Sequence, residues 1–197
     1  MDILLLLAHP DQSSFNHAIA ARAALTCRQL GHRLVSHDLY TEAFPALLPA
    51  AEIPGDGEID RLIASHCAEL AAADVIIVVH PNWWGMPPAV LKGYIDRVFR
   101  PGLAYEFIDG DCGEGVPVGL LKARKALVFN TSNTAAKREL AVFGDPLDTI
   151  WRNCVFGLCG VTSVHRFVFE TVCTSTVVQR QQWLEDVEQA VTDALGS

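Results

Sequence analysis

The sequence has no apolar run of the roughly 18 residues that a membrane span requires. Its N-terminal apolar stretch, residues 3–8, has no basic residue before it and leads directly into a polar turn. We therefore predict neither a spanning segment nor a cleaved secretory signal, and we expect a soluble, cytoplasmic protein without membrane insertion.

Basic residues are scarce: the chain has 15 Lys and Arg against 23 Asp and Glu, a formal net charge of −8. Nucleic acids and anionic lipids bind clusters of Lys and Arg, so we predict no nucleic-acid partner. The six cysteines include no C-x-x-C pair and no metal-ligand spacing with His, so we expect reduced structural thiols and no metal site. These cysteines are Cys27, Cys67, Cys112, Cys154, Cys159 and Cys173.

Three well-known site motifs are also missing. There is no G-x-G-x-x-G and no G-x-x-x-x-G-K-[ST], which argues against a nicotinamide Rossmann site and against a nucleotide triphosphatase. There is no G-x-S-x-G elbow either, which argues against an α/β hydrolase.

What is present is an alternation of apolar runs with helix-like segments, the βαβ pattern of a parallel sheet. Half of the 197 residues are hydrophobic, which fits one compact domain over residues 1–197. We predict an α/β fold, a doubly wound five-stranded parallel sheet with helices on both faces. The predicted strands are residues 3–7, 33–39, 75–80, 126–130 and 161–169, and the predicted helices are residues 14–30, 58–73, 89–99, 145–158 and 177–195.

In a doubly wound sheet, ligands lie outside the carboxyl ends of the strands, where the strand order reverses. Three loops qualify, residues 8–16, 81–88 and 131–134. Two long connections, residues 40–57 and 101–122, are expected to be lids or interface elements.

The first loop, AHPDQSSFN, places small polar residues at the start of a helix. Backbone N–H groups there point outward with the positive end of the helix dipole behind them, which suits an anion such as phosphate. Side chains of His9, Ser13, Ser14 and Asn16 can add donors. The alternative is that Ser13 or Ser14 simply caps the helix.

The second loop, PNWWGMPP, brackets Trp83 and Trp84 with prolines and predicts a rigid aromatic wall beside a flat conjugated ring. We also expect at least one of the two tryptophans to pack under the following helix. Charged residues of that helix are expected on a solvated or dimer-facing surface: Lys92, Asp96, Arg97 and Arg100. The third loop, NTSNT, offers hydroxyl and N–H groups, a weak signal on its own.

Together these segments resemble the flavodoxin-like NAD(P)H:quinone oxidoreductase family, which includes DT-diaphorase and ancillary subunits of bacterial glutathione-gated potassium efflux systems. The matching pieces are AHPDQSSFN, PNWWGMPPAVLKGYIDRVF, LAYEF and FGDPL, and the stretch containing LKG is the most specific. The resemblance covers most of the chain.

The resemblance implies a tightly bound flavin, FMN or FAD, that takes a hydride from NAD(P)H and passes two electrons to a quinone or similar flat electrophile by a ping-pong scheme. It implies a homodimer with each site at the interface, and we expect the long loop of residues 101–122 to contribute contacts. The flavin phosphate would contact His9, Ser13, Ser14, Phe15 and Asn16; the ring would contact Pro81, Asn82, Trp83, Trp84 and Gly85, with Thr131, Ser132, Asn133 and Thr134 at its polar edge.

The sequence departs from the family at two places. A Thr-Thr-Gly-Gly turn is replaced by residues 131–134, Thr-Ser-Asn-Thr, and Thr134 cannot adopt a left-handed conformation cheaply, so a different turn is expected. The family's downstream Tyr and His are also absent, with Phe143 where the His is expected. By residue type alone, His80, His165 and Lys137 are substitutes, and we assign no catalytic residue.

An alternative function from another class is a flavin-binding regulatory subunit that docks on a membrane transporter with little turnover of its own. Catalytic turnover of a quinone would argue against it. The sequence distinguishes neither FMN from FAD nor NADH from NADPH.

Overall fold

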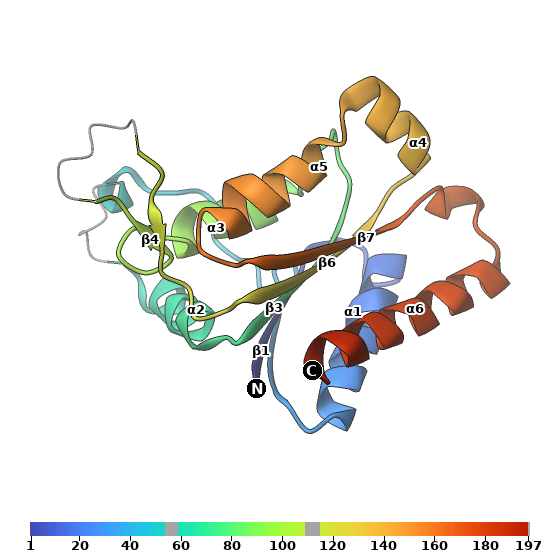
Figure 1. Ribbon diagram of the computed structural model, residues 1–197, viewed down its shortest axis with the longest axis horizontal. Helices are drawn as coiled ribbons and strands as arrows, with labels where there is room; N and C mark the ends of the chain where they lie inside the picture. The colour runs from blue at the N-terminus through green and yellow to red at the C-terminus, as the bar shows by residue number, and fades with distance from the viewer. Residues whose placement is uncertain (54–58, 109–114, 197) are drawn as a thin grey trace.

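The computed structural model describes residues 1–53, 59–108 and 115–196. Its centre is a five-stranded parallel sheet in the order β2-β1-β3-β6-β7, which confirms the predicted doubly wound fold (Figure 1). Each strand end lies within two residues of its predicted position. The strands are β1 (Asp2–Leu7), β2 (Arg33–Asp38), β3 (Val75–Pro81), β6 (Lys125–Thr131) and β7 (Ser163–Phe169).

Helices cover both faces of the sheet (Figure 1). On one face, α1 (Phe15–Gln29) and α6 (Val177–Leu195) pack against alternate residues of the central strands. On the other lie α2 (Arg61–Ala72), α3 (Ala89–Val98), α5 (Pro146–Thr149) and the π-helix η3 (Ile150–Gly157). Because both faces are covered, β3 is buried along its whole length, as parallel sheets require.

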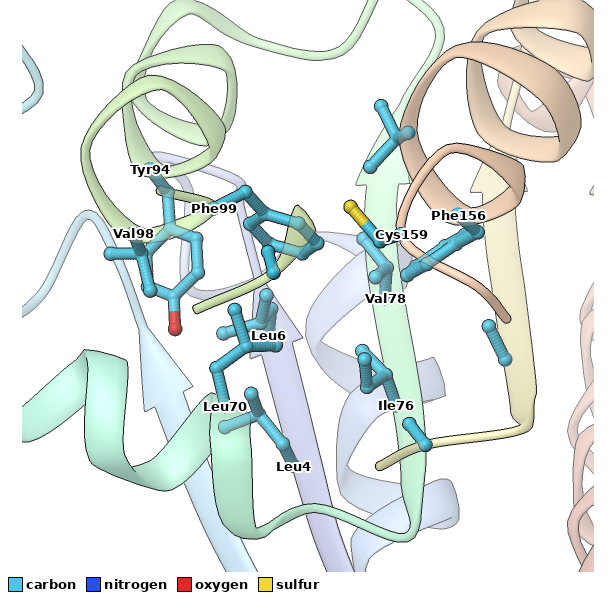
Figure 2. Close-up of a cluster of buried hydrophobic side chains, with 14 of the residues drawn as sticks. Leu4, Leu6, Leu70, Ile76, Val78, Tyr94, Val98, Phe99, Phe156 and Cys159 are labelled. Atoms are coloured by element: carbon cyan, nitrogen blue, oxygen red, sulfur yellow. The ribbon is translucent and has the colours of Figure 1, made fainter. Parts of the chain in front are cut away.

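The core under α2 and α3 is built from several elements that converge on β1 and β3. Figure 2 shows these side chains pointing toward one another between the helices and the sheet. They include Leu4, Leu6, Leu70, Ile76, Val78, Tyr94, Val98, Phe99, Phe156 and Cys159.

The helix ends follow local capping chemistry. Helix α1 begins after Ser14, whose hydroxyl accepts from the His17 N–H, and the chain turns at Gly31 with φ +77°. Helix α2 begins after its cap Asp60, later than predicted, and residue 58 lies outside the described residues. The predicted helix at 145–158 is α5 continued by η3, because apolar spacing does not distinguish α-helical from π-helical turns.

Several short elements were not predicted. They are η1 (Ala50–Glu52), the antiparallel pair β4 (Tyr105–Glu106) and β5 (Val118–Gly119), α4 (Ala136–Arg138), the π-helix η2 (Glu139–Phe143) and η4 (Val172–Thr174). The two long connections hold η1 and the β4–β5 pair, and their residues 54–58 and 109–114, with Cys112, lie outside the described residues.

We predicted that four charged residues in and just after α3 lie on a solvated or dimer-facing surface, and this is wrong for two of them. Lys92 and Asp96 are exposed and pair with each other, but Arg97 and the following Arg100 are buried, 2% and 8% exposed. Both guanidinium groups contact the buried carboxylate of Glu52. A distant carboxylate therefore brings them into the interior, which the charge pattern of the helix alone does not reveal.

The glycine of the LKG motif allows α3 to touch a neighbouring loop. A Cβ added to Gly93 would lie 2.1 Å from the Ala46 carbonyl oxygen and 2.5 Å from the Ala46 Cβ. Both distances are far below contact distance, so the backbones would have to separate.

We expect Gly93→Ala to destabilise the protein by about 1–2 kcal/mol. Alanine gains about 1 kcal/mol in helix propensity, but overpacking this close to backbone costs about 2–3 kcal/mol, the upper part of the usual range, and outweighs it. Urea unfolding measures the difference, and Ala64→Gly, at an exposed position of α2, calibrates the propensity effect alone. An unchanged or raised unfolding midpoint for Gly93→Ala would contradict the close approach.

None of the helices in the described ranges is long and apolar enough to cross a membrane. The five cysteines in those ranges are free thiols, and burial raises the pKa of Cys27 and of Cys159 to about 11. Both are therefore neutral thiols at physiological pH.

Candidate functional site

A cavity of about 800 Å³ opens at the carboxyl ends of β1, β3 and β6, where the strand order reverses. The structure brings together in its wall every predicted site residue except Ser13. These are His9, Ser14, Phe15, Asn16, Pro81, Asn82, Trp83, Trp84, Gly85, Thr131, Ser132, Asn133 and Thr134.

One end of the cavity is the N-terminus of α1. Among the described residues, the backbone N–H groups of Phe15 and Asn16 have no hydrogen-bond partner. The Nδ1 atom of His9 lies 3.1 Å from the Asp11 backbone nitrogen and 3.2 Å from the Asp11 carbonyl oxygen, and burial lowers the pKa of His9. His9 is therefore neutral, and the tautomer in which Nδ1 accepts from the Asp11 N–H leaves Nε2–H as a donor.

Ser13 does not line the cavity. Its hydroxyl and its backbone N–H both donate to Asp11 Oδ1, at 2.7 Å and 2.8 Å. The residue thus shapes the turn before α1, since Asp side chains commonly accept from the backbone two residues on.

The tryptophan loop is a tight two-residue turn. Trp83 and Met86 exchange backbone hydrogen bonds, and Trp84 and Gly85 between them have φ values of +59° and +71°. These are the signs that a type I′ turn requires. A Cβ on Gly85 would lie 2.8 Å from Pro146 Cγ, so this glycine is needed for its φ and for its closeness to α5.

The expectation that one tryptophan packs as core is wrong. Trp83 is 40% exposed and Trp84 is 98% exposed. The turn projects both rings from the sheet instead of under α3, and Trp83 lies 6.0 Å from the His9 ring, centroid to centroid.

The hydroxyl-rich turn is joined to the first loop by a buried contact. Asn16 Nδ2 donates to Thr131 Oγ1 at 3.0 Å, so this amide group fixes two loops relative to each other. Neither Asn133 nor Thr134 has a positive φ, which agrees with the steric expectation for Thr134. The turn is held by the Thr134 N–H donating to Ser132 Oγ and by Asn133 Oδ1 accepting from Cys173.

Sequence reasoning missed several residues in the wall: Asp11, Glu139, Pro146 and Val172. It noted Phe143, which lies there too, only as the replacement of a histidine. Glu139 Oε1 accepts from Asn82 Nδ2 at 3.2 Å. Glu139 comes from η2 and Pro146 from α5, and the Gly144–Asp145–Pro146 turn is the one signal that could have placed these two. No Lys or Arg of the described residues lines the cavity.

The three substitutes named by residue type all lie outside the cavity wall. Lys137 and His165 are exposed, and His165 contacts Ser163. His80 is fully buried: Trp151 Nε1 donates to its Nε2 at 3.0 Å, and its Nδ1 donates to the Pro81 carbonyl at 2.8 Å. Burial lowers the pKa of His80 to about 4. It is a neutral structural bridge between β3 and η3.

The buried His80–Trp151 contact predicts that the fold loses stability in acid. Because the folded-state pKa of His80 lies below the unfolded value of 6.5, the unfolded chain binds a proton first, and stability falls as the pH drops from about 6.5 toward 4. At pH 5 the loss relative to pH 7 is about 2 kcal/mol from this residue. Urea unfolding at both pH values should show a smaller loss in His80→Gln by that amount, and equal losses would contradict the assignment.

Comparisons with known proteins agree with the fold and the motifs. The family that matches residues 1–192 is described as having a flavodoxin-like fold. An uncharacterized NAD(P)H oxidoreductase of Haemophilus influenzae is 34% identical over 86% of this chain and 83% of its own length. An FMN-dependent NADH:quinone oxidoreductase of Cereibacter sphaeroides is 28% identical over 81% of this chain and 71% of its own.

A solved structure extends the likeness to three dimensions. The NAD(P)H:quinone oxidoreductase from Methanothermobacter marburgensis has a TM-score of 0.81 at 21% identity, covering 98% of this chain and 96% of that one. The predicted resemblance to flavodoxin-like NAD(P)H:quinone oxidoreductases is confirmed, and the chain belongs to the flavodoxin-like fold family.

Proposed function

We propose that this protein is an FMN-dependent NAD(P)H oxidoreductase that reduces quinones or similar flat electrophiles by two electrons. The observation that carries the proposal is one cavity with the N-terminus of α1 at one end and the Trp83 turn along its wall. The Cereibacter sphaeroides relative, named as FMN-dependent, supports FMN as the flavin.

The hydrogen-bond donors at the α1 end of the cavity fit a phosphate. The unpartnered N–H groups of Phe15 and Asn16 and the Ser14 hydroxyl can hydrogen-bond an anion at the positive end of the 15-residue helix α1. His9 adds a neutral donor through Nε2–H. No Lys or Arg among the described residues lines the cavity, so the donors that this wall offers a phosphate are neutral N–H and O–H groups.

The remaining wall fits a flat ring. We infer that Pro81, Asn82, Trp83, Trp84 and Gly85 frame the ring. Residues 131–134 hydrogen-bond its polar edge. A bound flavin supplies the hydride acceptance from NAD(P)H and the two-electron delivery to the acceptor, while the chain positions the reactants and excludes water. NAD(P)H and the acceptor would use the same open face in turn, which gives ping-pong kinetics.

We also propose a homodimer in the cytoplasm. Exposed apolar side chains flank the cavity: Trp84, Leu140, Val142 and Phe143 are 98%, 66%, 62% and 54% exposed. Apolar surface gathered in this way marks interaction sites. The free cysteines fit a reducing compartment. Sedimentation of the holoprotein tests the dimer, and a monomer at micromolar concentration would contradict it.

The function is tested with the purified protein. We expect a yellow sample that releases FMN on denaturation and that oxidises NADH or NADPH when a benzoquinone is added, with parallel lines in double-reciprocal plots. A colourless protein that takes up neither FMN nor FAD would overturn the proposal. A flavin-loaded protein without turnover would favour the regulatory-subunit alternative.

A further inference from the structure

A second polar cluster lies outside the cavity, between the end of β2 and helix α2. His37 is on β2, Glu42 is in the turn that follows, and His66 and Glu69 are on α2. None of these four residues lines the cavity. His37, Glu42 and His66 each offer one ligand atom, and these atoms lie within 4.8 Å of one another.

His66 is a buried imidazole with an unused nitrogen. It is 2% exposed, and its Nδ1 has no hydrogen-bond partner. That atom lies 4.0 Å from Glu69 Oε2, and the His66 ring centroid lies 4.1 Å from that of His37. An unpaired buried nitrogen is costly, so its position within this cluster points to a missing partner.

The ring of His66 is also held in place. Phe44 and Tyr94 pack edge-on against it, with centroids at 5.4 Å and 5.5 Å.

His37 has the arrangement typical of a metal-binding histidine. One ring nitrogen, Nδ1, faces Glu42 Oε1 at 3.0 Å, and the other, Nε2, faces Glu69 Oε2 at 2.7 Å. Metal-bound histidines commonly donate their second N–H to a carboxylate, which fixes the ring and raises its basicity. Glu69 is placed to do this while Nδ1 faces the cluster.

We propose that His37, Glu42 and His66 bind one divalent transition-metal ion of the Zn²⁺ type, with Glu69 orienting His37. Two imidazoles and a carboxylate suit Zn²⁺ and leave a fourth position for water. Tetrahedral bonds of 2.0–2.1 Å bring ligand atoms to roughly 3.4 Å from one another. The ligand atoms lie within 4.8 Å of one another, so a bound ion would draw them closer, and Glu42, with a side chain 36% exposed, gives the ion a route from solvent.

The bound ion would tie the end of β2 to α2. Spacing in the sequence did not reveal this site, because its ligands are contributed by a strand, a turn and a helix up to 29 residues apart. The expectation of no metal site rested on cysteine spacing, which does not test a site made of histidine and glutamate.

The test is calorimetric titration of the EDTA-treated, flavin-loaded protein with ZnCl₂. We expect one Zn²⁺ per chain and no binding of Mg²⁺, which disfavours imidazole. Saturating Zn²⁺ should raise the melting temperature by about 5 °C or more, as expected for a ligand specific to the native state.

Variants separate this site from others. Glu42→Gln and His37→Gln should each weaken Zn²⁺ binding at least tenfold and remove the thermal shift. Two controls should leave both unchanged: Glu188→Gln, an exposed carboxylate elsewhere, and His32→Gln, whose ring lies 3.3 Å from the N-terminal amine. Absence of stoichiometric binding, or binding that Glu42→Gln and His37→Gln leave intact, would overturn the proposal.

Discussion

Ser14→Asp should abolish flavin retention while leaving the fold intact. Ser14 is the N-cap of α1 and lines the cavity at the proposed phosphate end. A carboxylate at about 4 Å from a phosphate charge is unfavourable by about 4 kcal/mol at an effective dielectric constant of 20. This corresponds to a roughly thousandfold loss of FMN affinity.

The fold should survive, since aspartate is as good an N-cap as serine. Far-UV circular dichroism and the melting temperature of the flavin-free proteins check this. The matched control is Ser14→Asn, a neutral cap of the same size as aspartate, which should retain FMN within about tenfold of the wild type. Fluorescence titration with FMN measures all three proteins, and equal affinity in Ser14→Asp and Ser14→Asn would place the phosphate elsewhere.

The strands and the location of the cavity followed from the sequence because both depend on short-range patterns. Residues 3–7 and 75–79 are unbroken apolar runs, and such runs form central strands when both faces are covered. The switch-point rule then named the three loops that meet at the cavity. Among these loops the adjacent tryptophans were the more specific signal, because hydroxyl residues are common in turns.

The parts that escaped prediction depend on local geometry and on contacts that the residue pattern does not specify. Ser13 and Ser14 look alike in the sequence, but Asp11 engages Ser13 and leaves Ser14 as the cap. Segment η2, which brings Glu139 and Phe143 to the cavity, is a π-helix without a characteristic sequence period. The tryptophans project outward because their turn requires positive φ at Trp84, a conformation that no composition rule assigns to tryptophan.

Arg97 is the clearest case of a contact that the sequence pattern does not reveal. Its replacement is expected to cause the largest loss of stability. Its side chain is 3% exposed and contacts both Glu52, whose side chain is 5% exposed, and Asp60, at 2.9 Å, the N-cap of α2. It also donates to the Pro45 carbonyl at 2.6 Å. One guanidinium thus holds α3, the loop after β2 and the start of α2 together.

We expect Arg97→Met to lower the free energy of unfolding by about 3–5 kcal/mol, because it removes one partner of a buried ion pair and keeps the other buried. For a chain of this size the melting temperature should fall by about 10 °C. Methionine keeps most of the volume, so lost packing contributes little.

The matched control is Arg22→Met, which removes an arginine paired with Glu188 at the surface, where the partner's side chain is 51% exposed. Exposed ion pairs contribute about 0–1 kcal/mol, so the same chemical change should there be nearly neutral. Urea unfolding of both variants isolates the effect of burial from that of losing an arginine. If Arg97→Met were no more destabilising than Arg22→Met, Arg97 would not be what anchors the loop, and Arg100, the other arginine in contact with Glu52, would be enough to compensate the buried carboxylate.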